Sequence, residues 1–155
     1  MKLRLISKIL GTGLILFSFI QIIPTLISLI YAENNLYSFF QSALITFFTG
    51  LFLFGVNYSK DYEDLKIRDG FLLIVLLWFV FSIFAGIPFI LQENGLSIVN
   101  AYFESVSGLT TTGATIFVNL DDQLKSVLFY RALLQWVGGL GIVVLALALF
   151  PILGL

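Results

Sequence analysis

Three consecutive threonines and a glycine, Thr110 to Gly113, are the residues of this chain best suited to handling an ion. A potassium ion that enters a protein exchanges its hydration oxygens for fixed ones, and neutral backbone carbonyls stacked at close spacing serve this purpose. Threonine favours extended backbone and adds a hydroxyl oxygen, while glycine permits torsions that aim consecutive carbonyls at one axis. Since no acidic residue occurs in Leu109–Leu120, selectivity would come from backbone dipoles and not from a ring of carboxylates. Taken alone, the same run is also typical of a loop that simply turns the chain.

The composition argues against most other kinds of site. Of the 155 residues, 59% are hydrophobic and 11% are charged, whereas a soluble domain carries about 25% charged residues. The mean hydropathy of +1.06 therefore favours the bilayer as solvent. The chain has no cysteine and no histidine, so it lacks the usual metal ligands and the commonest general base. Without a nucleotide loop or a carboxylate pair away from the interfaces, we expect no enzyme activity and no organic cofactor. The net charge of −1 gives no reason to expect nucleic acid as a partner.

Four long uncharged stretches predict four membrane-spanning helices. Each exceeds the roughly 20 residues that cross the hydrocarbon core as a helix, and they occupy residues 9–32, 34–59, 70–92 and 132–155. The first follows a basic N-terminus but is longer than the apolar region of a signal peptide, which has roughly 7–15 residues, so we interpret it as a retained span. Pro24 and Pro88 are expected to kink their spans without a chemical role. The predicted fold class is an all-α integral membrane protein.

The distribution of Lys and Arg predicts the orientation of the spans. Basic residues cluster at the N-terminus and in the loop 60–69, whereas the connection after the first span has Glu33 and no basic residue. Both basic segments, and both ends of this chain, are therefore expected on the cytoplasmic side of the cytoplasmic (inner) membrane. The segment from Glu93 to Lys125, in which acidic residues predominate, then enters and leaves from the outer face.

Part of this outer segment is predicted to enter the membrane without crossing it. Leu96–Gly108 is typical of a short helix, with Ser97 as its N-cap and Gly108 as its terminator. Twelve residues at ~1.5 Å each span ~18 Å, about half of the bilayer core. A half-depth helix with a non-helical return is a re-entrant loop, which is tolerated where protein buries it or a water-filled pathway adjoins it. Because the helix runs inward, its C-terminal end, with about −0.5 charge, would face a cation at the centre of a pore.

The sequence around this loop resembles the Trk/Ktr/HKT family of potassium transporters. Residues 101–115, AYFESVSGLTTTGAT, are similar to the family's first pore loop. Residues 129–146, FYRALLQWVGGLGIVVLA, resemble the span that follows it in TrkH-type subunits. The match continues through Phe150–Gly154, and the N-terminal pair of spans and Arg68–Phe71 also resemble TrkH-type subunits, so it covers essentially the whole chain. The pore-loop and Trp-x-Gly-Gly matches are specific, whereas hydrophobic spans alone would not be.

The resemblance implies a leading helix hairpin followed by four linked span–pore–span repeats around one ion path. This chain would contain the hairpin and one repeat, and would supply one quarter of a selectivity filter. We favour the front part of a longer transporter over a naturally short subunit that oligomerises into a cation channel. The implied divisions are a hairpin at 1–59, a cytoplasmic loop at 60–69 and a repeat at 70–155, with spans at 70–92 and about 126–151, a pore helix at about 97–108 and a filter at 110–115.

The resemblance also implies binding residues and partners. Potassium would be held by the main-chain carbonyls of Thr111, Thr112 and Gly113, with Thr110 at the cytoplasmic end. The loop departs from the longer Gly-Tyr-Gly filter of potassium channels, which implies moderate selectivity with some passage of rubidium or sodium. Partners implied besides membrane lipid are the remaining pore repeats, a second copy of the full subunit and a cytosolic nucleotide-binding (TrkA-like) ring. The charged loop 60–69 is a candidate contact for that ring, although a solvated loop is the simpler interpretation.

Several residues near the loop have two interpretations each. Arg131, near the outer end of the last span, is either an interfacial anchor or a partner of Glu104 that braces the filter. Glu104 lies within the re-entrant helix, where bracing is favoured over a solvent-facing role. Gly138, Gly139 and Gly141 predict close helix packing or a wide ion path below the filter. The predicted function is potassium uptake, and the alternative is a non-conducting assembly subunit with a vestigial loop.

Overall fold

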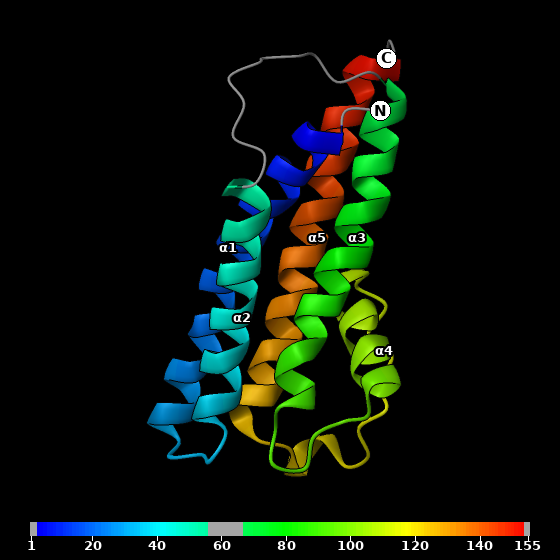
Figure 1. Cartoon of the computed structure of the whole chain (residues 1–155). Coiled ribbons are helices and arrows are strands. Elements are labelled where there is room, and N and C mark those ends of the chain that lie inside the picture. Colours follow the sequence, from blue (N-terminus) through cyan, green and yellow to red (C-terminus); the bar gives the residue numbers. More distant parts are fainter. Residues whose placement is uncertain (1–2, 56–66, 154–155) are drawn as a thin grey trace.

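A computed structural model describes residues 3–55 and 67–153, which are mainly helical (Figure 1). Four of the helices are long and apolar enough to cross a membrane, and the part of the chain that is described contains no strand. The predicted all-α membrane fold with four spans and a short additional helix is thus confirmed. The elements are α1 (Leu3–Ile30), α2 (Leu36–Gly55), α3 (Ile67–Ile90), α4 (Ile98–Leu109), the 3₁₀ turn η1 (Leu120–Asp122) and α5 (Lys125–Leu153).

Three of the four long helices begin before the uncharged stretches of the sequence, because they include charged residues at their N-terminal ends. The third span begins at Ile67 and ends at Ile90, and the last begins at Lys125 and continues to Leu153. Most of the predicted cytoplasmic loop 60–69 lies outside the described residues, and its last residues already form the start of α3. Residues 67–69 of the predicted loop are helical, and Asp69 among them is buried. The helix therefore extends into the end of the predicted loop.

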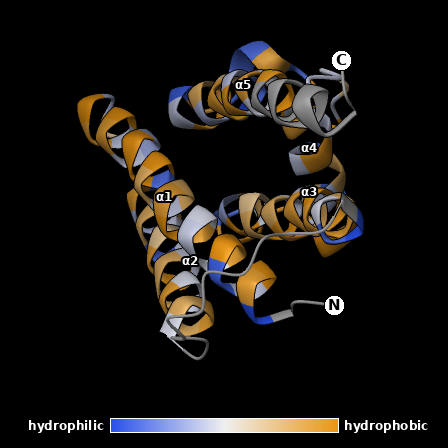
Figure 2. Cartoon of the chain, turned by 90° about the horizontal axis from the view of Figure 1, so that it is seen from above, coloured by the Kyte–Doolittle hydropathy of each residue, from blue (hydrophilic) through white to orange (hydrophobic). Residues whose placement is uncertain are grey.

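The short helix α4 stands apart from the four long helices. It lies at the end of the bundle where the α1–α2 and α3–α4 connections also lie, and it extends about halfway along α3 (Figure 1). Seen from above, α4 sits between α3 and α5, on the side away from the α1–α2 hairpin (Figure 2). Its packing partners are accordingly α3 and α5. This arrangement leaves the loop that follows α4 beside α5.

The outer surface of the bundle is apolar, as a lipid solvent requires. Large apolar side chains on several helices are strongly exposed, among them Phe52 (67%), Val75 (64%) and Trp136 (63%). Figure 2 shows hydrophobic positions around most of the helical surface. In a water-soluble monomer, contiguous apolar exposure on this scale would favour association. The burial pattern therefore supports four spans whose outer faces contact lipid or further protein.

Two glycines allow α1 and α2 to touch through their backbones. A Cβ atom on Gly11 would lie 2.7 Å from the carbonyl oxygen of Gly50, and one on Gly50 would lie 2.9 Å from that of Gly11. Small residues permit such close approach in membranes, where packing and polar contacts replace the hydrophobic effect between helices. The two helices thus form one hairpin unit.

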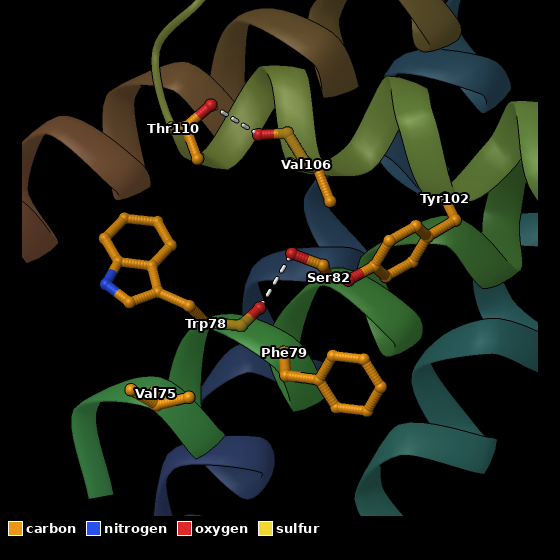
Figure 3. A pocket seen from close by; sticks show the side chains of 7 residues that line it. All are labelled: Val75, Trp78, Phe79, Ser82, Tyr102, Val106 and Thr110. Atoms are coloured by element: carbon orange, nitrogen blue, oxygen red, sulfur yellow. Dashed lines mark hydrogen bonds between the residues drawn. The ribbon is translucent and has the colours of Figure 1, made fainter. Parts of the chain in front are cut away.

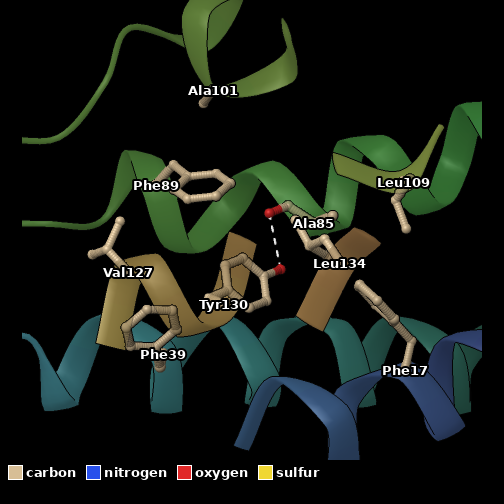
Figure 4. Close-up of a cluster of buried hydrophobic side chains, with 9 residues drawn as sticks. All are labelled: Phe17, Phe39, Ala85, Phe89, Ala101, Leu109, Val127, Tyr130 and Leu134. Carbon is tan, nitrogen blue, oxygen red and sulfur yellow. Dashed lines mark hydrogen bonds between the residues drawn. The ribbon is translucent and has the colours of Figure 1, made fainter. Parts of the chain in front are cut away.

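The hairpin is fixed to the rest of the bundle at a carbonyl that a proline leaves free. Pro88 in α3 has no N–H, so the carbonyl of Phe84, four residues earlier, loses its intrahelical donor. The Nε2 of Gln21, a buried residue of α1, donates to this oxygen at 2.9 Å. One residue on, the Tyr130 hydroxyl of α5 donates to the Ala85 carbonyl at 3.0 Å (Figure 4). Three helices therefore meet at this turn of α3. Pro88 leaves a carbonyl free to bind another helix, whether or not it also kinks its own.

Two further polar contacts fix the other end of the hairpin. The carboxylate of Glu33, in the α1–α2 connection, accepts from the backbone N–H groups of Lys125 at 2.6 Å and Ser126 at 3.1 Å. These are the first two residues of α5, whose N–H groups have no intrahelical acceptor and whose helix end favours negative charge. The Ser38 hydroxyl of α2 donates to the Leu91 carbonyl at 2.8 Å. The hairpin thereby helps to position the helix that supports the loop after α4.

Replacing Gln21 with methionine tests the contact at the freed carbonyl. The side chain keeps its length but loses its donor, so Phe84 is left with an unsatisfied carbonyl, and we expect the free energy of unfolding to fall by about 1–2 kcal/mol. Titration with a denaturing detergent in mixed micelles measures this value. Gln41→Met, at an exposed glutamine of α2, is the matched control. In the double variant Gln21→Met/Pro88→Ala the restored N–H of residue 88 should recover part of the loss; a loss that is merely additive would contradict the interpretation.

Candidate ion-binding loop

The helix that leads into the loop starts as the sequence predicts. The Ser97 hydroxyl accepts from the backbone N–H of Asn100 at 3.3 Å, which confirms Ser97 as the N-cap of α4. The helix is held closely against α3, because a Cβ atom on Gly86 would lie 3.3 Å from the Ala101 carbonyl oxygen. The Ser105 hydroxyl of α4 donates to the Ser82 carbonyl of α3 at 2.7 Å. These contacts fix the depth and the direction of α4 in the bundle.

The prediction that Gly108 terminates this helix is wrong. The helix includes Gly108, ends at Leu109 and has Thr110 as its C-cap. Gly108 is buried, and a Cβ atom on it would lie 3.0 Å from the Cβ of Leu134 in α5. The glycine is therefore needed for close packing and not for a left-handed backbone, and the sequence alone does not distinguish these two uses.

The chain leaves α4 through hydrogen bonds that are characteristic of a helix C-terminus with a left-handed residue. The N–H of Thr111 donates to the Gly108 carbonyl at 3.0 Å, and the N–H of Thr112 donates to the Ser107 carbonyl at 3.0 Å. This pair of bonds is a Schellman motif, in which glycine usually takes the left-handed position. Here Thr111 occupies it, with φ +58°. The expectation of extended backbone in the threonine run is thus wrong at Thr111 and also at Thr110, whose φ of −80° and ψ of 2° are not extended.

The backbone at Thr111 is strained. A β-branched residue at positive φ is an outlier, and the left-handed conformation costs roughly 1–2 kcal/mol for an L-residue. Such strain persists where surrounding contacts determine the backbone, and it is concentrated at functional sites. Gly113, with φ +76°, adopts a left-handed conformation at which glycine has no such cost. Two residues with positive φ, Thr111 and Gly113, therefore lie on either side of Thr112 in the loop.

The hydrogen bonds of the loop determine where its carbonyls point. The N–H groups of four successive residues, 110–113, donate to the last carbonyls of α4, at distances of 2.8 to 3.4 Å. In a trans peptide unit the N–H and the preceding C=O point in opposite directions, and the described residues contain no cis peptide bond. The carbonyls of Thr110, Thr111 and Thr112 consequently point away from the end of α4. All three residues are exposed.

The threonine hydroxyls are used within the loop. The Thr110 hydroxyl donates to the Val106 carbonyl at 2.8 Å, which also accepts the N–H of Thr110. The hydroxyl oxygens of Thr110 and Thr112 lie 2.8 Å apart. Because the single hydroxyl proton of Thr110 is directed at Val106, Thr112 is the donor of this pair.

Figure 3 shows Thr110 at one end of a shallow recess between α3 and α4, which is lined by Val75, Trp78, Phe79, Ser82, Tyr102, Val106 and Thr110.

One buried carboxylate holds the chain as it returns from the loop. Glu104, whose side chain is 1% exposed, forms an ion pair with the Nε of Arg131 in α5. Its oxygens also accept from the Thr115 hydroxyl at 3.1 Å and from the backbone N–H of Ile116 at 3.1 Å. The ring of Phe117 lies 5.8 Å from the Arg131 guanidinium carbon. The structure thus brings together the two charged residues singled out in the sequence. It adds Thr115, which the sequence analysis included in the filter at 110–115 without predicting its bond to Glu104.

The glycines of α5 differ in what they face. A Cβ atom on Gly138 would lie 1.8 Å from the Leu109 carbonyl oxygen, so the end of α4 rests directly on this glycine. A Cβ on Gly139 would lie 3.8 Å from the Cγ2 methyl of Thr111, and one on Gly141 would meet nothing within 4 Å. Close packing is therefore the role of Gly138, and it positions the residue immediately before the loop.

The loop is suited to binding a cation through neutral oxygens and not through carboxylates. Among the described residues no group of three or more His, Cys, Asp or Glu side chains could hold a metal ion. The charge of Glu104 is directed at Arg131 and the return segment. What the loop offers to a ligand is a row of neutral carbonyl oxygens, whose peptide units are fixed by bonds to α4.

A family model described as "TrkH: Cation transport protein" matches residues 36–155. The chain belongs to the TrkH family. It is 47% identical, over 99% of its length, to the Trk system potassium uptake protein TrkH of Escherichia coli K12. It is 37% identical to TrkG of the same organism over 98% of its length. The crystal structure of the potassium transporter TrkH from Vibrio parahaemolyticus covers all of this chain at 43% identity with a TM-score of 0.93.

The match extends over a limited part of these relatives. This TrkH family chain spans about a third of their length: 32% of the Escherichia coli protein and 33% of the chain in the Vibrio parahaemolyticus structure. Membership of the TrkH family, together with four candidate spans, identifies the chain as a multi-pass membrane protein. The resemblance noted from the residues around the loop is thereby confirmed at the level of the family.

Gly138→Ala tests whether α5 positions the loop in this TrkH family chain. The added methyl would meet a backbone oxygen and has no rotamer to escape to, so we expect a loss of about 1–3 kcal/mol in the free energy of unfolding, or more. Gly141→Ala is the matched control, since it adds the same methyl to the same helix in open space. Equal stability of the two variants in detergent titration would refute the close contact between Gly138 and Leu109.

Glu104→Gln tests the buried ion pair. The amide keeps the shape of the carboxylate but leaves Arg131 without its counter-charge, and breaking a buried pair in this way costs about 3 kcal/mol or more. Asp121→Asn, at an exposed carboxylate of η1, is the control for the same chemical change. Should both variants unfold at the same detergent concentration as the unaltered chain, the pair would have no stabilising role.

Proposed function

We propose that this chain contributes one quarter of the selectivity filter of a TrkH-type potassium uptake system. The main-chain carbonyls of Thr111, Thr112 and Gly113 bind dehydrated K⁺, and the Thr110 carbonyl contributes at the cytoplasmic end. The observation that carries the proposal is the set of amide bonds from residues 110–113 to the end of α4, because these bonds direct the carbonyls of Thr110, Thr111 and Thr112 to the opposite side. The Gly113 carbonyl is included because the family resemblance implies it. The relatives' names as potassium uptake proteins support the choice of ion.

The helix dipole acts through these bonds in the proposed mechanism. The carbonyls of Val106, Ser107 and Gly108 accept the loop amides and therefore do not face the ion themselves. The peptide units of the loop are therefore aligned with those of the helix, so the negative end of the combined dipole lies at the loop carbonyls. Neutral oxygens held in this way replace water around K⁺ without binding it so strongly that it cannot leave.

The ion pair of Glu104 and Arg131 braces the filter in this proposal. Glu104 holds the return segment at Thr115 and Ile116, and Arg131 fixes Glu104 to α5. The brace therefore connects the two chain segments that flank the filter to a spanning helix. Arg131 would be chiefly a partner of Glu104 and only secondarily an interfacial anchor.

The proposal extends to the rest of the assembly, as the family resemblance implies. Three further pore repeats complete the filter, the full subunit forms a homodimer, and a cytosolic nucleotide-binding (TrkA-like) partner regulates it. Both ends of this chain face the cytoplasm, so α4 enters from the outer side of the cytoplasmic membrane. K⁺ is the transported ion, with no organic cofactor and no enzyme activity.

Gly113→Ala in a complete transporter tests the proposed function. Residues 1–155 are joined to the remaining two thirds of the Escherichia coli relative, and uptake of K⁺ is measured in cells that depend on it for growth at limiting potassium. Within this chain a Cβ on Gly113 meets nothing within 4 Å, so here the substitution acts through the left-handed backbone. We expect the maximal uptake rate to fall about five- to thirtyfold, since alanine at φ +76° costs roughly 1–2 kcal/mol and relieves that strain only by changing the carbonyl directions.

Gly70→Ala is the control, because Gly70 also faces open space but has no positive φ. Unchanged uptake in Gly113→Ala would contradict the filter assignment and favour the second candidate function, a non-conducting assembly subunit with a vestigial loop. In that case the chain would still be needed for the assembled transporter to reach the membrane, which immunodetection of the membrane fraction measures.

A further inference from the structure

One residue of the pore helix contacts three successive residues of the loop. The Ser107 carbonyl accepts the N–H groups of Thr112 at 3.0 Å and Gly113 at 3.4 Å. The Ser107 hydroxyl donates to the carbonyl oxygen of Ala114 at 2.6 Å. Ser107 is buried, with 5% of its surface exposed. Sequence reasoning assigned no role to this serine, since one hydroxyl in a helix rich in small residues is not distinctive.

The two kinds of contact have opposite effects on the carbonyls that they control. The amide bonds to the Ser107 backbone turn the carbonyls of Thr111 and Thr112 away from α4. The bond from the Ser107 hydroxyl turns the carbonyl of Ala114 toward α4. The direction of the carbonyls therefore reverses between Thr112 and Ala114, across the left-handed Gly113.

The chain beyond this reversal is held by a different residue on the same helix face. Glu104, one turn before Ser107, binds Thr115 and Ile116. The Thr115 hydroxyl in turn accepts the N–H of Phe117 at 3.1 Å. Ala114, Thr115 and Ile116 are all bonded to the face of α4 formed by Glu104 and Ser107. After Thr112, the carbonyl of Ala114 is the first that a described hydrogen bond turns toward α4, and its donor is the Ser107 hydroxyl.

We propose that Ser107 is a specificity-determining positioning residue, whose hydroxyl holds the Ala114 carbonyl out of the ion path and so ends the row of ion-facing carbonyls at Gly113. This inference rests on the proposed function of the loop as a potassium filter. Without the hydroxyl, the Ala114 carbonyl loses its donor and is free to rotate toward the exposed side. An additional, poorly positioned oxygen then competes for the ion beside Gly113, and a filter with mobile oxygens adapts more readily to the smaller Na⁺.

Transport by Ser107→Ala in the same complete transporter tests the effect on selectivity. A hydrogen bond of this kind contributes about 0.5–1.5 kcal/mol, so we expect the discrimination between K⁺ and Na⁺ to fall roughly two- to tenfold. The half-saturating K⁺ concentration should change more than the maximal rate. Ser105→Ala is the matched control, because it removes a buried hydroxyl from the same helix whose acceptors, Ser82 and Tyr102, lie outside the loop.

A spectroscopic measurement tests the contact itself, independently of transport. Ala114–Thr115 is the sole Ala–Thr step in the sequence. Labelling the 155-residue chain with carbonyl-¹³C alanine and ¹⁵N threonine therefore gives a single carbon–nitrogen correlation in solid-state NMR spectra of the chain in lipid bilayers. The Ala114 carbonyl resonance should shift in Ser107→Ala, which removes its donor, and stay in place in Ser105→Ala.

The two measurements separate failure of this inference from failure of the proposed function. An unmoved Ala114 resonance in Ser107→Ala overturns the inference, as does a shifted resonance with unchanged K⁺/Na⁺ discrimination. Equal loss of discrimination in Ser105→Ala also overturns it, since a general effect on α4 would then suffice. If the unaltered transporter carried no K⁺, the proposed function and the selectivity role would both fall, while the NMR result would still decide whether Ser107 holds Ala114.

Discussion

Where a chain leaves a helix inside a membrane, its backbone N–H and C=O groups need partners within the protein, because no bulk water is available to them. The loop after α4 meets this requirement by returning its amides, from Thr110 to Gly113, to the last carbonyls of α4. The same bonds that satisfy the amides orient the carbonyls on the other side of each peptide unit. Stability of the loop and exposure of its oxygens are thus two results of one set of hydrogen bonds, and an ion can satisfy the oxygens that the protein leaves open.

The requirement for partners also explains how the N-terminal hairpin is attached. Pro88 frees a carbonyl near the C-terminal end of α3, and Gln21 satisfies it from another helix. Glu33 does the same for the first amides of α5. In each case a backbone group that the local helix cannot satisfy becomes a specific docking point for another element. The position of α5 then determines where Gly138 receives the end of α4 and where Arg131 meets Glu104.

Much of the fold could be predicted from the sequence, because charged residues separate the spans and a twelve-residue helix is too short to cross. The Ser97 cap was also predictable, since capping depends on residues three apart. The attachment of the hairpin was not, because Gln21 and Phe84 are 63 residues apart and Glu33 and Lys125 are 92 apart. The local conformational preferences of the residue types gave wrong predictions at two positions. Gly108 serves packing and not termination, and Thr111 takes a left-handed conformation that its side chain disfavours.

The central claim is that backbone carbonyls of this loop, aimed by amide bonds to α4, bind the transported ion. Anomalous X-ray diffraction from crystals of the complete transporter carrying residues 1–155, grown with Rb⁺ in place of K⁺, tests this claim most directly. We expect anomalous peaks in coordination contact with the carbonyl oxygens of Thr111, Thr112 and Gly113, and none beside the Ala114 oxygen. Peaks at the Glu104 carboxylate, or ordered loops from all repeats with no peak between them, would contradict it.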